Sequence, residues 1–130
     1  MPVEFINPEE LHQPPTYSHV AIARGLRTVY VSGQVGFDED GQLVGEDDFT
    51  QAQRAFANLA TALEAAGATL QDVAKITIFV VGHRPQLLEP LMAARADAFG
   101  EHKPASTYVG VEALARPGLL VEVEAVAVLD

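Results

Sequence analysis

Apolar residues recur along this chain with two different periods, and the two periods predict two helices and six strands. Strand-like patterns, which alternate or are rich in β-branched residues, occupy 17–24, 28–33, 42–44, 73–81 and two segments within 104–130. Gly25-Leu26-Arg27 is predicted to be a hairpin link between the first two strands. Residues 1–16 carry four prolines, so we expect an extended or irregular lead-in there.

Helical periodicity is clearest from Phe49 to Ala66, where the apolar residues form one stripe. Asp47 and Asp48 are candidate N-caps and place negative charge at the positive end of the helix. Gly67 is typical of the residue that ends a helix. A second helix is predicted to begin near Glu89, with a proline in its first turn, where a missing N–H costs nothing.

The order of these elements predicts the fold class. Strands, helix, strand, helix and strands together favour an α+β sandwich, with two helices on one face of a mixed, mainly antiparallel sheet. The segment 73–81 is apolar on both sides and should be a central strand. We expect one domain spanning residues 1–130, because no linker or internal repeat interrupts it. The face of the sheet without helices would need a cover, and a second copy of the chain is the simplest one.

Composition and charge exclude several classes of function. The formal net charge is −10 and no basic cluster is present, so nucleic acid is disfavoured as a partner. The absence of cysteine removes disulfides and thiolate chemistry. No apolar run reaches the ~20 residues that a membrane span needs, and the amino terminus lacks the features of a signal peptide. We therefore expect a cytoplasmic protein that does not associate with membranes.

Motifs for bound metals and nucleotides are also missing from the sequence. The four histidines are scattered without ligand spacing, so no metal site is expected. No Gly-rich loop leads from a strand into a helix, and a Ser-His-Asp arrangement has no support from spacing. Candidate chemistry must come from other side chains.

Two glutamates lie on one side of the last predicted strand. Side chains alternate along this strand, so Glu122 and Glu124 share a face with Leu120, Val126 and Val128. Two interpretations stay open at this point. The carboxylates lie on a solvated face, or one of them is partly desolvated at a pocket and acts as an acid or base.

Other candidate residues also have two interpretations each. Tyr17 and Tyr108 are either packing residues of a core or interface, or ligand contacts. Ser32 precedes Gly33 at a strand end, which is either a plain terminus or a place where hydroxyl and N–H groups hold a carboxylate or carbonyl. Arg95 is interpreted as a cation near the end of the second helix, where it suits the helix dipole.

Four stretches together resemble the RidA family, also called YjgF or L-PSP-like. They are Ser32-Gly33-Gln34, 51–59, 63–70 and 121–127, and the resemblance covers about residues 15–129. It implies a fold like the small chorismate mutases, assembled as a homotrimer with ligand sites in clefts between subunits. It also implies hydrolysis of reactive imines or enamines to 2-keto acids and ammonia, without a metal or organic cofactor.

The chain departs from the family pattern at the expected substrate site. Active deaminases of the family carry an arginine directly after Pro-Ala, and this arginine holds the substrate carboxylate; here the position is Ser106. A hydrogen bond to a charged group contributes roughly 1.5–3 kcal/mol, so its loss should weaken binding by at least about 10–100-fold. Ala93 stands where a helix asparagine is common, and Tyr108 stands where a small Cys or Thr is common. The open question is whether Arg95 or Arg116 replaces the missing arginine.

The remaining matches define the predicted site. The resemblance implies that Glu122 orients or activates the attacking water, and that Tyr17, Ser32 and Gly33 line the cleft with Ser106 and Tyr108. The expected ligand is a small molecule that carries a carboxylate or carbonyl group. The first functional prediction is hydrolysis of an imine, enamine or related C–N compound with altered specificity. The alternatives are a non-catalytic trimer that binds a metabolite or partner protein and, third, an L-PSP-type endoribonuclease or translation inhibitor.

Overall fold

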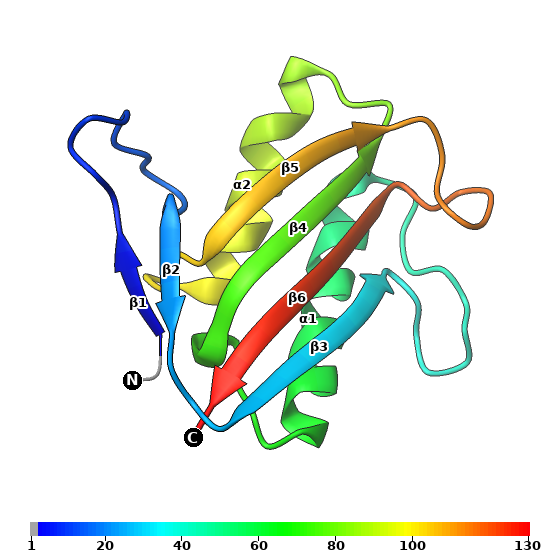
Figure 1. The fold of residues 1–130 in the computed structure, drawn as a ribbon. Helices are drawn as coiled ribbons and strands as arrows, with labels where there is room; N and C mark the ends of the chain where they lie inside the picture. Colours follow the sequence, from blue (N-terminus) through cyan, green and yellow to red (C-terminus); the bar gives the residue numbers. More distant parts are fainter. Residues whose placement is uncertain (1–2) are drawn as a thin grey trace.

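The structure is a computed structural model that describes residues 3–130. It contains a four-stranded sheet with two helices on one face and a separate two-stranded sheet beside it (Figure 1). In chain order the elements are β1 (Val3–Ile6), β2 (Val20–Ala23), β3 (Arg27–Val35), α1 (Asp48–Ala65), the 3₁₀ turn η1 (Leu70–Asp72), β4 (Val73–Val81), α2 (Pro85–Phe99), β5 (Ala105–Val111) and β6 (Val121–Leu129). The predicted α+β class, with both helices on one face, is confirmed.

The larger sheet has the strand order β3-β6-β4-β5. The β4–β5 pair is parallel and is connected through α2, while the other two pairs are antiparallel, so the sheet is mixed as predicted. Strand β4 lies between β5 and β6, which confirms its central place. Its residues Ile76, Ile78 and Val80 point into the core beneath the helices, where they are buried against the apolar stripe of α1.

The other face of this sheet is not covered by any element within residues 3–130 (Figure 1). We call this surface the open face. It consists of alternate residues of β3, β6 and β4, namely Tyr30, Ser32, Glu122, Glu124, Val126, Lys75, Thr77 and Phe79. Tyr30 is 78% exposed here, although it is a large aromatic residue in the middle of a strand. The uncovered surface agrees with the expectation of a second copy, but the homotrimer itself stays a prediction.

Helix α1 begins and ends where its caps predict. An oxygen of the Asp47 side chain accepts a hydrogen bond from the backbone N–H of Thr50 at 3.0 Å, and this bond lowers the pKa of Asp47. Gly67 follows the helix with φ 79°, a left-handed conformation that favours glycine. Near the start of the helix, the buried amide of Gln51 donates to the carbonyl of Gly118 and accepts from the N–H of Leu120. These two bonds hold the start of β6 against α1.

The amino-terminal half differs from the sequence prediction in its strand pairing. Gly25-Leu26-Arg27 does not form a hairpin, because β2 pairs with β1 and β3 pairs with β6. At Gly25 the chain instead passes close to the end of β6, where a Cβ would overlap the carbonyl of Leu129. Residues 1–16 are not a wholly irregular lead-in either, since Val3–Ile6 forms β1. Residues 1–2 of that segment lie outside the described residues. The segment 42–44 makes only one isolated bridge, between Phe37 and Leu43, because no neighbouring strand extends that pairing.

Helix α2 begins one turn earlier than predicted. Its first residue is Pro85, whose missing N–H is harmless at this position, whereas Pro90 lies inside the helix. The prediction near Glu89 placed the wrong proline at the helix start. The earlier start adds Leu87 to the buried side of the helix and Leu88 to the side that faces β5.

Candidate functional site

A cavity of about 450 Å³ lies between α2 and the edge strand β5. We call it the β5 cavity. Its lining residues are Pro15, Thr16, Tyr17, Leu88, Met92, Arg95, Ser106 and Tyr108. Three of the predicted site residues, Tyr17, Ser106 and Tyr108, are therefore brought together. The size lies within the range of small-molecule sites, and the lining is mostly apolar with a few polar groups, as such sites usually are.

Local structure explains how these three side chains reach the cavity. Ser106 and Tyr108 pair in register with Ile76 and Ile78 of β4, so they point to the helix-covered side of the sheet. Tyr17 is positioned by the next residue, Ser18, which forms an isolated bridge with Ala105 at the start of β5. The Ser18 hydroxyl also donates to the carbonyl of Lys103 at 2.6 Å, which fixes the segment at the mouth of the cavity.

Each tyrosine hydroxyl of the cavity is hydrogen-bonded to a histidine ring. The oxygen of Tyr17 lies 2.7 Å from Nε2 of His12, and that of Tyr108 lies 2.8 Å from Nδ1 of His83. Burial, with a smaller contribution from the carboxylate of Asp48, raises the pKa of Tyr108. Tyr108 therefore stays a neutral hydrogen-bonding group at physiological pH. Sequence reasoning missed both histidines, because no spacing pattern links either ring to its tyrosine.

Arg95 is a charged residue of the cavity whose position differs from the sequence interpretation. It precedes the last turn of α2, which contains no basic residue, and its side chain is only 4% exposed and lines the β5 cavity. Burial lowers the pKa of the Arg95 guanidinium to about 10, so it remains a cation at neutral pH. A helical signal was available, since Leu88, Met92 and Arg95 are spaced to share one side of a helix. Ala93 is exposed and lies outside the cavity lining, which contains Met92 instead.

The other predicted site residues lie at the open face, on β3 and β6. Strand β3 bulges between Val31 and Gln34, so Ser32 and Gly33 have no partner residue in the register with β6. Glu122 packs directly onto this bulge. A Cβ at Gly33 would overlap the Glu122 carboxylate, and it would lie 2.6 Å from the carboxyl carbon. Glu122 is half-buried and has no ion-pair partner among residues 3–130.

One protomer therefore separates the predicted site into two groups. Glu122 pairs with Phe79 across β6 and β4, on the open face, whereas Ser106 pairs with Ile76, on the helix-covered face. Strand β4 lies between β6 and β5, so the two groups are on opposite sides of the sheet and two strands apart. Tyr17, Ser106 and Tyr108 are together, and Ser32, Gly33 and Glu122 are together, but no single cavity of the protomer contains all six.

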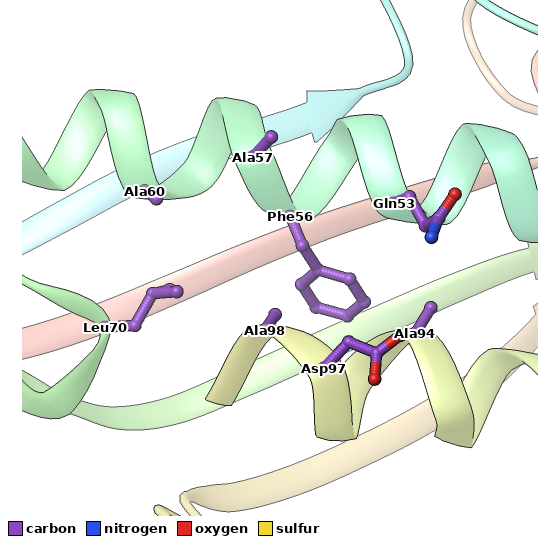
Figure 2. A pocket seen from close by; sticks show the side chains of 8 residues that line it. All are labelled: Gln53, Phe56, Ala57, Ala60, Leu70, Ala94, Asp97 and Ala98. Atoms are coloured by element: carbon purple, nitrogen blue, oxygen red, sulfur yellow. The ribbon is translucent and has the colours of Figure 1, made fainter. Parts of the chain in front are cut away.

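Two further hollows lie on the protein surface. A groove between α1 and α2, of about 250 Å³, is lined mainly by alanines, with the ring of Phe56 directed toward Ala94 and Ala98 (Figure 2). Its only polar side chains are Gln53 and Asp97, which offers little for recognition. The second hollow, about 260 Å³, is a depression of the open face between Tyr30 and Thr77. The open-face hollow does contain a cation, Lys75, but its ammonium group donates to the Thr107 hydroxyl at 2.6 Å. Neither hollow contains a buried cation or any of Tyr17, Ser106 and Tyr108.

The described part of the chain contains neither a cluster of metal ligands nor a membrane-spanning helix. Residues 3–130 contain no cluster of three or more His, Asp or Glu side chains arranged to hold a metal ion. His12 and His19 do come together, with ring centroids 4.8 Å apart, but they pack edge to face beside Tyr17. No helix within residues 3–130 has the length and apolar character needed to cross a membrane.

These features define a class of small α+β proteins with a helix-covered sheet, an uncovered sheet face and a cavity at the sheet edge. The family model described as endoribonuclease L-PSP matches residues 9–129. The chain belongs to this family, the same group as RidA and YjgF, which confirms the resemblance seen in the sequence.

Individual relatives support the same assignment. The crystal structure of YyfB from Yersinia pestis, a member of the conserved Rid protein family, superimposes with a TM-score of 0.94 at 39% identity and covers 99% of this chain and 100% of that one. A 2-iminobutanoate/2-iminopropanoate deaminase of Mus musculus is 37% identical over 103 residues, 78% of this chain and 74% of the relative. A RutC family protein of Pyrococcus abyssi is 35% identical over 100 residues, 76% of each chain.

Proposed function

We propose that this protein hydrolyses imines or enamines of small carboxylic acids, at a site formed between two copies of the chain. The observation that carries this proposal is the position of Glu122. Its carboxylate is half-buried beside the Gly33 bulge, has no cationic partner among residues 3–130, and faces the surface that a second copy would cover. A carboxylate that no cation engages is free to accept a proton from water and to return it, as a general acid–base group must. The mouse relative named as an imine deaminase supports this class of reaction.

The proposed chemistry needs only water and a group that moves protons. Glu122 accepts a proton from water as the water oxygen bonds to the imine carbon, and the C=N bond becomes a single bond. The same carboxyl then delivers this proton to nitrogen, which gives a carbinolamine. It next transfers the carbinolamine hydroxyl proton to nitrogen as the C–N bond breaks, so that ammonia leaves and the oxygen forms the carbonyl of a 2-oxo acid. An enamine first takes a proton at carbon to become the imine. The net reaction converts one imine and one water into one 2-oxo acid and one ammonia.

A site between subunits follows from the separation of the two groups of residues. A ligand small enough for the β5 cavity cannot reach through the sheet from Ser106 to Glu122 of the same chain. The cavity lies at the β5 edge of the protomer, and the open face needs a cover. Contact between the β5 edge of one copy and the open face of another would satisfy both requirements. The family's closed trimer would repeat this contact three times.

Imine turnover tests the proposal with a matched pair of variants. Imines are generated in situ from several amino acids by an amino acid oxidase, and release of the 2-oxo acid is followed against capture of the imine by semicarbazide. Glu122→Gln should lose catalysis by about 10²-fold or more. Glu124→Gln is the control, because Glu124 lies two residues along the same strand on the same face. Equal loss in both variants, or none in Glu122→Gln, would sink the assignment of Glu122.

A non-catalytic binding protein is the second candidate, and Ser106 is the observation that favours it. The family's substrate arginine is replaced there by a short hydroxyl side chain. This candidate expects thermal stabilisation by a ligand without turnover of any imine. An endoribonuclease activity, which the description of the family model names, is disfavoured by the net charge of −10. It would require RNA binding with a steep dependence on salt.

A further inference from the structure

Arg95 is a buried cation that lacks a counter-ion. Its side chain is 4% exposed, yet no carboxylate of residues 3–130 lies within ion-pair distance of it. One nitrogen, Nη2, donates a long hydrogen bond of 3.4 Å to the carbonyl of Pro104, and Nε has no hydrogen-bond partner. The ring of Phe99 lies 6.0 Å from the guanidinium carbon. Buried charges are ordinarily paired, because an unpaired one keeps the full cost of leaving water.

The unpaired guanidinium lines the same cavity as Ser106. Leu88, Met92 and Arg95 lie on one side of α2, and that side forms one wall of the β5 cavity, while Ser106 and Tyr108 of β5 form the opposite wall. A smaller hollow of about 70 Å³ continues past Arg95 toward Lys103. A cation is therefore present on the helix wall of the cavity, while the strand wall lacks the arginine that the family carries at the position of Ser106.

We propose that Arg95 binds the carboxylate of the ligand in the β5 cavity, and that this ligand is a monocarboxylate with an apolar body. The unpaired Nε–H and the weakly bonded Nη2 supply donors suited to the two oxygens of a carboxylate. The proposal rests on the proposed function only for the reaction that follows binding. Binding itself needs no catalytic group.

The rest of the lining specifies the body of this ligand. Pro15, Leu88 and Met92 offer apolar contacts, and the rings of Tyr17 and Tyr108 add aromatic surface. The hydroxyls of Ser106 and Thr16 make no hydrogen bond with the protein among residues 3–130, and that of Ser106, on the wall opposite Arg95, suits a carbonyl or imine nitrogen next to the carboxylate. A branched or aromatic side chain of four or more carbons fills such a cavity better than a methyl group does. We therefore expect the affinity to rise from small to larger 2-oxo acids.

Calorimetric titration of stable 2-oxo acids into the full-length protein tests this assignment, because it measures binding while no reaction takes place. The probes are 4-methyl-2-oxopentanoate, its neutral methyl ester, and the smaller 2-oxopropanoate. In Arg95→Met, we expect binding of the larger acid to weaken by about 10–100-fold, the size of a charge-assisted hydrogen bond. The ester should bind wild type and Arg95→Met equally. Arg95→Lys should keep part of the preference for the acid over the ester.

Arg116→Met is the matched control, since it removes the same charge elsewhere. Arg116 is exposed and stacks over Phe37, 5.2 Å from the ring centroid, and it does not line the β5 cavity. This variant should bind the acid like wild type. If Arg116→Met loses the acid and Arg95→Met keeps it, the anchor is Arg116 from a neighbouring copy and the proposal is wrong.

Two further measurements test the proposal, and the first uses wild type alone, so it does not depend on whether Arg95→Met folds. In wild type, the Nε–H proton of Arg95 should move downfield in the NMR spectrum when the acid is added and stay in place with the ester; no movement with the acid overturns the proposal. The double variant Arg95→Met/Ser106→Arg should recover acid binding from the opposite wall. Failure of the proposed function can be distinguished from failure of this proposal. In that case wild type would still bind the acid but would hydrolyse no imine.

Discussion

Arg95 and Glu122 are two charged groups of opposite sign on opposite faces of one sheet, and the structure treats them differently. Arg95 is enclosed by its own chain, between α2 and β5, whereas Glu122 lies on a surface that residues 3–130 leave uncovered. The cation is therefore buried within one protomer, while the environment of the carboxylate depends on what covers the open face. The proposed ligand anchor and the proposed acid–base group can be tested separately, because each charge is surrounded by a different set of contacts.

Gly33→Ala should have the largest effect on the carboxylate side of this comparison. The new methyl group would overlap the Glu122 carboxylate and displace it, so we expect imine hydrolysis to fall by about 10²-fold or more. Turnover is measured for Gly33→Ala, Glu122→Ala and the double variant. If glycine acts only by making room for Glu122, the double variant is no worse than Glu122→Ala. Additive losses would contradict this account.

Val126→Asp should uncover Glu122 while leaving the β5 cavity intact. Val126 is a half-buried residue of the open face, two positions from Glu124, and a charge there is costly inside a subunit contact. Mass photometry or light scattering should report trimers for wild type and monomers for the variant. Thr61→Asp, on the exposed side of α1, is the control and should remain trimeric. A monomeric wild type would overturn the inter-subunit site.

Arg95→Met should stabilise the ligand-free protein, although it removes ligand binding. Burial lowers the folded-state pKa of Arg95 to about 10, below its ordinary value, so the folded state holds this proton less tightly than the unfolded state does. The cation therefore lowers stability at every pH below about 10, and this cost is relieved as the pH rises above that value. A lowering of this size corresponds to at most about 3 kcal/mol in the free energy of unfolding.

Urea unfolding at pH 7 without ligand measures this gain. Arg116→Met is again the control and should change stability little, because its guanidinium is exposed. A large loss of stability in Arg95→Met would mean that a carboxylate of a neighbouring copy already neutralises the cation. The cation would then be a subunit contact and not a ligand anchor.

Asp47 gives the smallest effect and a reference for pH dependence outside the site. Hydrogen bonds from Thr50 lower its pKa below the ordinary 3.8, so its contribution to stability is present above that value and is lost as the pH falls through the folded pKa. Asp47→Ala should lower the melting temperature slightly at pH 7, and the difference from wild type should shrink in acid. Asp47→Asn keeps the cap and should show less of this acid dependence.

The elements that local chemistry determines were predictable from the sequence. The stripe of α1, its cap at Asp47 and its stop at Gly67 all act within one turn of the helix, so they are readable without knowledge of the fold. Strand β4 was recognisable as central from its β-branched residues. Strand β1 was not, because its pairing with β2 is a contact across a proline-containing loop that no local pattern indicates.

The candidate site was predicted as a set of residues but not as an arrangement. Which face Ser106 and Glu122 occupy depends on their register with Ile76 and Phe79, and register is a property of paired strands. The choice between Arg95 and Arg116 was left open for a related reason. The Arg95 side chain reaches the cavity because α2 packs the side that carries it against β5. The sequence predicted the helix but not which of its sides would face β5.

The shared cavity of Arg95 and Ser106 has a consequence for how this family diverges. Two guanidinium groups in one mostly apolar cavity would repel each other, so an arginine on the helix wall and an arginine on the strand wall should exclude one another across relatives. In evolution, the arginine can move from one wall of the cavity to the other only through an ancestor that lacked both arginines or tolerated both. Sequences that carry the pair should compensate with a nearby acid, and a survey of homologues for that covariation would trace the route.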